Sequence, residues 1–373
     1  MGPQRNQNEE MMKLLVAPPK RAGSGRLPLG DGGTPVSTLT RFGGRCVVVI
    51  ALCIVACAAA AQAPASSTAK AAAPHRLSKS EFDALFKQLS NWGRWGKNDE
   101  LGTVNLITPQ VRLQAVREVR SGVSVSLARP IVTTPSVDNA TPLKDVVTVN
   151  VDDKFNTDTY TVSFHGFGLS HFDSLAHTFY EGKLYNGFSE SDVTAAGTRR
   201  LDAEQYHDGI VTRGVLVDIP QLRGKPYLDT SDVITAADLD AWERRTGQHI
   251  RAGDAVFIRT GRWARRAALG PWDISQASAG LHPDAVSWLK QRDIAVLGSD
   301  AAHDALPSYV DGVDFPIHVL TIVAMGMPLL DQLDLENVAK TAARLHRTTF
   351  LLTFAPPRIQ DGTGSLINPI ATF

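Results

Sequence analysis

Strand-like and helix-like segments take turns along the second half of this chain, and the alternation limits the folds it can adopt. Residues 214–219 form an almost continuous apolar run that is typical of a buried strand, and residues 254–259 form another. Between them, Thr235-Ala236-Ala237-Asp238 is a capping-box pattern that opens a helix. The alternation predicts an α/β protein.

The same alternation continues to the C-terminus and begins well before residue 214. We expect helices at about residues 80–89, 283–291 and 335–345, and strands at about 123–127, 146–151, 294–298 and 349–354. No period of about 20 to 50 residues indicates a solenoid. We therefore predict one domain, residues 80–373, with a central mixed β-sheet flanked by helices.

An apolar, alanine-rich run lies near the N-terminus. It extends from Cys46 to Ala61, follows Arg41 and Arg45, and ends in small residues, which is typical of a secretory signal peptide. A membrane anchor is the first alternative, although 16 residues are short for a bilayer that needs about 20. Lipoprotein processing at Cys57 is the second.

Cleavage near Ala61 would divide the chain into three parts. Residues 1–61 are then an N-terminal extension with the signal peptide, residues 62–79 a linker, and residues 80–373 the folded domain. We expect an exported protein, periplasmic or secreted, with no stable membrane span after processing.

Charge and cysteine content exclude several functions. The chain has 38 Lys and Arg against 38 Asp and Glu, so no overall positive field exists to bind a nucleic acid. Its three cysteines all lie within residues 46–57, which leaves the expected domain without a thiol or a disulfide. A small-molecule partner fits this composition best.

Residues 164–177 contain three of the ten histidines and an aspartate. In an extended strand, His171 and Asp173 project from the same face, and His177 can return to them if the chain turns after the strand. Imidazole and carboxylate are the usual ligands of Zn²⁺ and Mn²⁺, and an open coordination position can activate a water molecule. Alternatively, these histidines only cap turns or form hydrogen bonds in a core.

This segment resembles the signature of the cyclase family that includes kynurenine formamidase and isatin hydrolase, His-x-Gly-Thr-His-x-Asp-x-Pro-x-His. His171, Asp173 and His177 stand at its second His, its Asp and its last His, and Ser170 replaces the Thr. Further similarity lies at residues 91–96, 213–218, 253–261, 298–300 and 362–369, so the resemblance covers roughly residues 80–373.

The resemblance implies roles for these residues. His171 and Asp173 would be metal ligands, and His177 would be the general acid and base. His318 and Asp331 would correspond to a downstream His and Glu that hold a second metal, with the shorter Asp in place of Glu.

One departure concerns the first His of the signature, whose place Phe167 occupies without any metal-binding atom. His165 is a possible substitute ligand or substrate contact, although six extended residues separate it from His171 by about 20 Å. Otherwise His171, Asp173, His318 and Asp331 alone would hold the metal. His303, which follows an expected strand end, and Phe167 itself are further candidates for substrate contact.

The resemblance implies a metal-dependent hydrolase, with Zn or Mn, that cleaves an amide, lactam or lactone of a small, aromatic or cyclic substrate. A non-catalytic small-molecule-binding protein of the same fold is one alternative, and a lyase or true cyclase that uses the same site is another. The resemblance also implies a homo-oligomer, at least a dimer.

Overall fold

The computed structural model describes residues 74–152 and 154–373. The expected signal peptide, its cleavage near Ala61 and the lipidation at Cys57 lie outside the described residues. Residues 74–79, which the sequence assigns to the linker, contact the domain: the backbone N–H of Leu77 donates to the carbonyl of Tyr309, and Arg76 pairs with Asp311.

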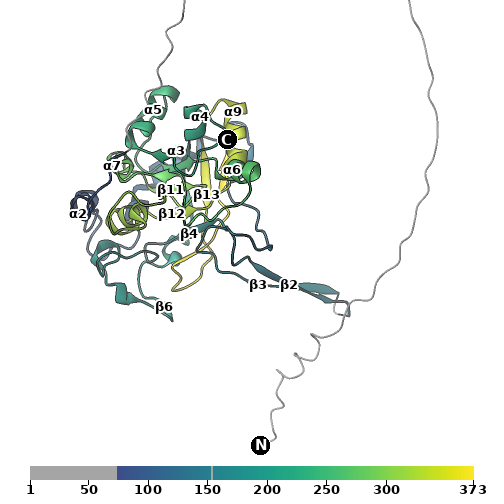
Figure 1. The fold of residues 1–373 in the computed structure, drawn as a ribbon. Helices are drawn as coiled ribbons and strands as arrows, with labels where there is room; N and C mark the ends of the chain where they lie inside the picture. Colours follow the sequence, from purple (N-terminus) through teal and green to yellow (C-terminus); the bar gives the residue numbers. More distant parts are fainter. Residues whose placement is uncertain (1–73, 153) are drawn as a thin grey trace, which may run out of the picture. The chain divides into compact units, whose positions relative to one another are not determined.

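A nine-stranded mixed sheet forms the centre of the domain (Figure 1), in the order β1-β15-β13-β7-β9-β11-β12-β4-β14. The four strands at its middle run parallel: β7 (Ile210–Asp218), β9 (Ala255–Arg259), β11 (Val296–Ser299) and β12 (Leu329–Asp331). The flanking strands pair antiparallel: β1 (Ser124–Ser126), β15 (Ile370–Thr372), β13 (Thr349–Phe354), β4 (His171–Asp173) and β14 (Gly364–Leu366). The structure confirms the predicted single α/β domain with a central mixed sheet.

The sheet is buried on both faces, which explains the continuous apolar runs of its central strands. Val215 and Val217 of β7 belong to one hydrophobic cluster, whereas Leu216 between them belongs to the other. Successive residues of a strand point to opposite faces, so a strand that is covered on both sides needs an apolar residue at every position.

Helices cover both faces. α2 (Lys79–Leu89), α5 (Ala236–Thr246) and α7 (Pro283–Gln291) contribute residues to the first cluster, and α9 (Glu336–Leu345) contributes to the second. Figure 1 shows α2 and α7 on one side of β11 and β12, with α9 and α6 (Arg262–Leu269) on the other. The capping box at Thr235 is confirmed, with Asp238 accepting from the Thr235 backbone N–H.

One helical segment has no amphipathic pattern, and sequence periodicity did not reveal it. α8 (Pro316–His318) continues into a π-helix, η5 (Val319–Met325), and every residue of both is buried. A helix that is apolar on all sides lacks the spacing by which helices are recognised. This segment carries His318 into the interior.

The remaining elements are short or lie at the periphery. They are η1 (Gly102–Leu106), α3 (Pro109–Val116), η2 (Tyr185–Gly187), η3 (Glu190–Asp192), β5 (Val193–Thr194), β6 (Gly197–Thr198), η4 (Ala203–Tyr206), α4 (Ile219–Arg223), β8 (Val233–Ile234) and β10 (Gly280–Leu281). Within the described ranges, no helix has the length and apolar character needed to cross a membrane.

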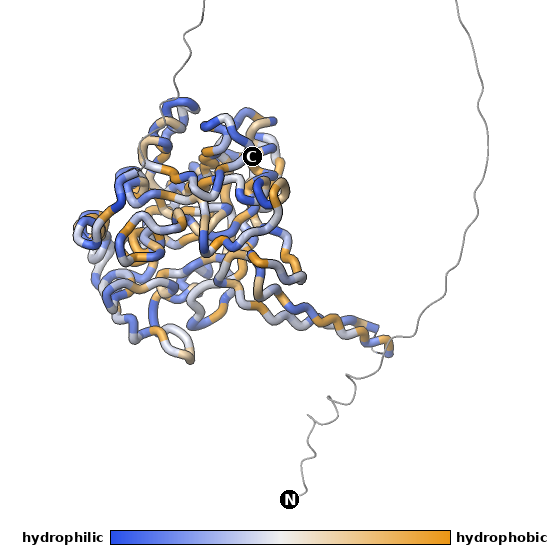
Figure 2. The backbone as a smooth tube through the Cα atoms, in the orientation of Figure 1, coloured by the Kyte–Doolittle hydropathy of each residue, from blue (hydrophilic) through white to orange (hydrophobic). Residues whose placement is uncertain are grey.

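Two strands stand apart from the central sheet. β2 (Lys144–Asn150) and β3 (Phe155–Thr161) pair only with each other and project from the body of the domain (Figures 1 and 2). The β-branched run at residues 146–151 was correctly predicted to be a strand, but neither face of it is buried against the domain.

Candidate metal centre

The histidine cluster is built around the short strand β4. Alternation along this strand places His171 and Asp173 on one face, while Phe172 points to the other and packs in the second hydrophobic cluster. Pairing between β4 and β12 sets His171 opposite Asp331. The strand therefore brings two carboxylates and an imidazole together from segments about 160 residues apart.

Asp173 lies at the centre of the cluster. Its side chain is fully buried, and neither carboxylate oxygen has a hydrogen-bond partner. Three imidazole nitrogens surround its Oδ1 atom: Nδ1 of His165 at 3.0 Å, Nε2 of His171 at 3.6 Å and Nε2 of His177 at 3.9 Å. Burial opposes ionisation, but the charges of His177 and His171 hold the pKa of Asp173 below its usual range.

In His171 and His318, the Nδ1 atom forms a hydrogen bond on the side of the ring away from Asp173. This directs the other ring nitrogen, Nε2, toward the carboxylate of Asp173. Nδ1 of His171 lies 2.8 Å from the carbonyl oxygen of Leu169, which can only accept, so Nδ1 carries the proton and Nε2 presents its lone pair. Nδ1 of His318 lies 2.6 Å from Oδ2 of Asp304 and leaves Nε2 for the cluster in the same way. Such outer partners are typical of metal-binding histidines.

His318 and Asp331 form the second half of the cluster. Nε2 of His318 lies 3.6 Å from Oδ2 of Asp331 and 3.9 Å from Oδ2 of Asp173. Burial lowers the pKa of His318, but its hydrogen bond to Asp304 and the negative charge of nearby Asp331 outweigh burial and raise the pKa well above the ordinary value. His303 approaches Asp331 from the other side, with Nε2 2.8 Å from Oδ1.

His165 lies much nearer to His171 than an extended chain allows, since their ring centroids are 5.4 Å apart. The chain bends at Gly166, whose φ of 154° favours glycine, and Nε2 of His165 lies 3.3 Å from the hydroxyl of Thr363. Gly364 leaves room for the ring, because a Cβ there would lie 2.8 Å from Cε1 of His165 and 2.3 Å from the carbonyl oxygen of Phe172.

A cavity of about 230 Å³ opens onto the cluster. Its walls include the rings of His165, His171, His177 and His318, together with Phe167, Phe315 and Gln332. The volume suits a small molecule of one or two rings.

Similarity to known proteins identifies the family of this chain. A family model described as "Putative cyclase" matches residues 110–303, more than half of the chain. The chain belongs to the putative cyclase family. The family resemblance read from the His171 to His177 signature is confirmed.

Solved structures similar to this chain include one cyclase that shares its fold. One described as a novel cyclase is 28% identical, has a TM-score of 0.69, and covers 77% of this chain and 99% of its own. An isatin hydrolase bound to thioisatinate is 22% identical, with a TM-score of 0.48 and coverage of 71% and 98%. Isatin hydrolase A from Ralstonia solanacearum is also 22% identical, with a TM-score of 0.47 and coverage of 71% and 97%. No curated protein matches the chain.

In this member of the putative cyclase family, Phe167 lines the cavity and its carbonyl accepts a hydrogen bond from Nη2 of Arg262. It stands where the signature has a histidine, and the ring of His165 takes the position next to Asp173 instead. One set of donor atoms within 4.8 Å of one another comes from His165, Asp173 and His177, and another from His171, Asp173 and Asp331.

His177 differs from the other rings in its surroundings. It stacks on His165, with ring centroids 4.1 Å apart, and among the described residues no side chain or backbone atom forms a hydrogen bond with its ring. Burial lowers the pKa of His177 to about 4 against the attraction of Asp173. The ring is therefore neutral at pH 7 and has a nitrogen free to accept a proton.

Two residues of the site were not found from the sequence. Asp304 orients His318 from a loop, and Gln332 lines the cavity with a left-handed φ of 57° and both side-chain amide atoms buried without a partner. A non-glycine residue with positive φ is a recurrent mark of functional sites. Sequence spacing does not show such a backbone conformation.

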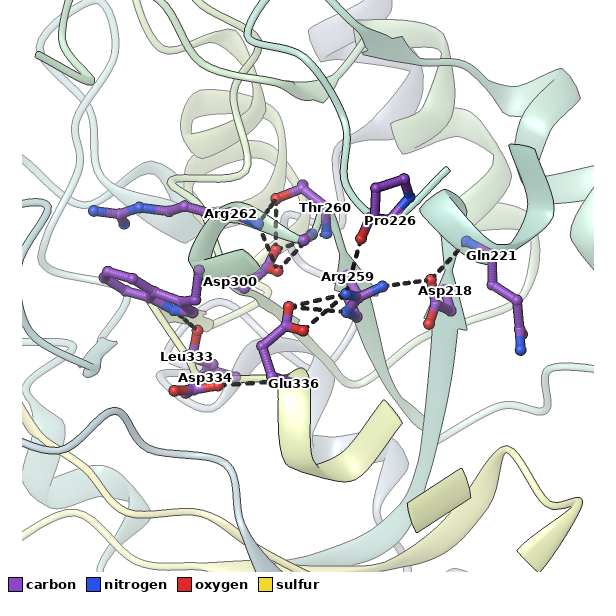
Figure 3. A network of polar contacts seen from close by, with 12 residues as sticks. Asp218, Gln221, Pro226, Arg259, Thr260, Arg262, Asp300, Leu333, Asp334 and Glu336 are labelled. Carbon is purple, nitrogen blue, oxygen red and sulfur yellow. Dashed lines mark hydrogen bonds and ion pairs between the residues drawn. The ribbon is translucent and has the colours of Figure 1, made fainter. Parts of the chain in front are cut away.

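A polar network around Asp300 fixes the residues at the start of α6 (Figure 3). Asp300, fully buried after β11, accepts hydrogen bonds from the backbone of Thr260 and Gly261, and burial raises the pKa of Asp300 to about 6. These bonds fix the start of α6, from which Arg262 reaches the Phe167 carbonyl. Asp300 thus has a structural role.

Proposed function

We propose that this chain is a metal-dependent hydrolase that cleaves an amide, lactam or lactone bond of a small, aromatic or cyclic substrate. The observation that carries the proposal is Asp173, a fully buried carboxylate without any hydrogen bond, next to imidazole rings that line a cavity. An unpaired buried charge is costly, and a bound cation would compensate it.

The donor atoms fit a divalent cation. Imidazole nitrogen and carboxylate oxygen suit Zn²⁺ and Mn²⁺, and the outer hydrogen bonds of His171 and His318 orient their free nitrogens toward Asp173. His171, Asp173 and Asp331 would hold one ion, and His165 would add a donor on the other side of Asp173. His318 and Asp331 would complete a second position that shares Asp173.

When bound, such a cation lowers the pKa of water and polarises a carbonyl group. The protein supplies the rest. His177, neutral and free of hydrogen bonds, would accept the proton of the attacking water and pass it to the leaving nitrogen or oxygen. Phe167 and Phe315 give the cavity apolar walls on which a ring can lie, and Gln332 places an unpaired carboxamide beside Asp331.

Two variants separate the roles of binding and proton transfer. In Asp173→Asn, bound Zn or Mn measured by elemental analysis should fall together with hydrolysis of a panel of amides, lactams and lactones. In His177→Ala, turnover should fall by about 100-fold or more while metal content stays close to one equivalent or above. Equal loss of metal in both variants would contradict the division of roles.

A non-catalytic binding protein is the second candidate, and Phe167 favours it, because this residue removes a donor that the family signature provides. That function predicts a protein that retains a cyclic ligand without turnover and contains no stoichiometric metal after growth in Zn- and Mn-replete medium. Hydrolysis by the metal-loaded wild type that is lost on chelation would exclude it.

A further inference from the structure

Arg129, in the segment that follows β1, has a guanidinium group without a hydrogen bond to any described residue. Its ion pair with Asp334 is long, with 3.8 Å between Nη1 and Oδ2, although the Arg129 side chain is only 19% exposed. Burial lowers the pKa of Arg129 below its ordinary value. A guanidinium offers five N–H donors, and leaving such donors unpaired in a partly buried place is costly. Arg129 is therefore able to bind a further acceptor.

Arg292 provides a comparison within the same chain. Its Cζ atom lies 3.7 Å from the centroid of the Trp288 ring, and its side chain is 20% exposed. The Cζ atom of Arg129 lies 3.6 Å from the centroid of the Trp263 ring. However, Nε and Nη2 of Arg292 donate to Glu243 at 3.1 and 2.6 Å. The two arginines have the same stacking and burial, but the donors of Arg292 are paired with a carboxylate and those of Arg129 are not.

Arg262 places a second cation beside the same tryptophan, with Cζ 4.1 Å from the centroid of the Trp263 ring. Its side chain is 2% exposed, and its Nε and Nη1 atoms are buried without a hydrogen-bond partner. Its Nη2 atom donates to the carbonyl of Phe167 and lies 3.9 Å from Oδ2 of Asp138. Figure 3 shows this side chain extending away from Asp300. Burial lowers the pKa of Arg262 to about 9, so the group is still charged at pH 7.

A cavity of about 220 Å³, here named the arginine cavity, lies against these side chains. Its lining includes Arg129, Arg266 and Asp138, and Nε of Arg266 lies 2.5 Å from Oδ2 of Asp138. Among the described residues, ion pairs join the three guanidinium groups to only two carboxylates, Asp138 and Asp334. An excess of positive charge beside a cavity attracts an anion.

A second, larger cavity indicates what kind of anion fits. It has a volume of about 580 Å³, and Arg129 is the one charged residue among the described residues that line it. Its other walls include Pro130, Ile131 and Ile367. A ligand with an anionic head at Arg129 and an apolar body would match both cavities. A planar carboxylate is the head group that pairs best with the parallel N–H donors of a guanidinium.

We propose that Arg129 anchors a second small-molecule site, which binds an organic carboxylate with an apolar body. The carboxylate pairs with the Arg129 guanidinium, and the body lies against Pro130 and Ile131. The residues that line the two cavities beside Arg129 include none of those that line the catalytic cavity. Gly168 lines the arginine cavity, whereas the preceding Phe167 lines the catalytic cavity, so the two sites lie on either side of one short segment.

The ligand class also has a link to catalysis, which rests on the proposed function. Hydrolysis of an amide, lactam or lactone releases a carboxylate, so the product of the proposed reaction is itself a molecule of the class that this site binds. The binding site does not require that activity, because none of its residues belongs to the histidine cluster.

Isothermal titration with sodium benzoate, at constant ionic strength in chloride, tests the proposal. The wild type should bind benzoate with a dissociation constant of about 1 mM or below, and Arg129→Gln should raise it by about tenfold or more. Arg292→Gln is the matched control, since Arg292 has the same stacking and exposure, and it should bind as the wild type does. Arg129→Lys keeps the charge but loses the paired donors, and should raise the constant by about threefold or more even if Arg129→Gln impairs folding.

Two further titrations identify the site and its ligand. Inorganic phosphate has no apolar body and should bind about tenfold more weakly than benzoate. Asp173→Asn, which removes a central donor of the metal centre, should keep the Arg129-dependent binding of benzoate, so that this result is independent of any hydrolase activity. Absence of benzoate binding in the wild type, equal binding in Arg129→Gln, loss of binding in Asp173→Asn, or phosphate that binds as tightly as benzoate would each overturn the proposal.

Discussion

Nδ1 of His165 lies 3.0 Å from Oδ1 of Asp173, although Phe167, two residues further on, occupies the place of the first histidine in the family signature. His165 therefore places an imidazole beside the carboxylate of Asp173, although the histidine of the signature is missing. Because His165 and Asp173 lie close together without the geometry of a hydrogen bond, a cation between them is the simplest arrangement that satisfies both.

His165→Ala should therefore lower the affinity for Zn²⁺ or Mn²⁺ by about 10- to 100-fold, as expected when part of a metal site is lost. Isothermal titration of the metal-free protein with ZnCl₂ measures this change. His207→Ala is the control, since His207 is exposed and away from the cluster. Unchanged affinity in His165→Ala would show that His171, Asp173, His318 and Asp331 suffice.

Asp304→Asn should weaken metal binding by loosening His318, because Asp304 accepts hydrogen bonds from Nδ1 of His318 and from the backbone N–H of Ile317 next to it. The carboxylate accepts the Nδ1 proton of His318 at 2.6 Å, and an amide oxygen holds that proton less strongly, so the ring becomes a poorer donor. We expect an affinity loss of about tenfold with an unchanged fold. Asp311→Asn, which breaks the exposed ion pair with Arg76, should leave metal affinity at the wild-type value.

The lowered pKa of His177 predicts a pH dependence of stability in the metal-free protein. The ring takes up a proton at pH about 4 when folded and at about 6.5 when unfolded, so the unfolded state binds more protons between these values. Wild-type stability relative to His177→Gln should then rise from pH 4 to 6.5, by up to about 3 kcal/mol, and stay level above. Urea unfolding across this range measures it, and a constant difference would contradict the lowered pKa.

Much of the fold could be predicted from local sequence patterns. The strands at residues 214–219 and 254–259 and the helix at 283–291 were predicted, because apolar runs and caps act over a few residues. The pairing of His171 with Asp173 followed from strand alternation alone. In contrast, the position of the His165 ring beside Asp173 involves a contact with Thr363, almost 200 residues away. No local sequence pattern contains that information.

Two further features could not be predicted from the sequence, for different reasons. The segment that carries His318 is buried on all sides and so lacks helical periodicity, and Gln332 adopts a left-handed backbone that tertiary contacts impose. The run at residues 146–151 was predicted correctly to be a strand, but local sequence cannot distinguish a strand of the central sheet from one of a separate two-stranded ribbon.

Gly364 offers a test of how tightly β14 encloses the site. A Cβ at this position would lie 2.3 Å from the carbonyl oxygen of Phe172 and 2.8 Å from Cε1 of His165, so Gly364→Ala must displace β4, the His165 ring or both. We expect a loss of about 1–3 kcal/mol in the free energy of unfolding together with weaker metal binding. Gly362→Ala is the matched control, because a Cβ there meets its nearest atoms at 3.5 Å, an ordinary contact distance. Thermal unfolding with and without ZnCl₂ measures both effects, and equal behaviour of the two variants would show that β14 yields to the added methyl group without disturbing the histidine cluster.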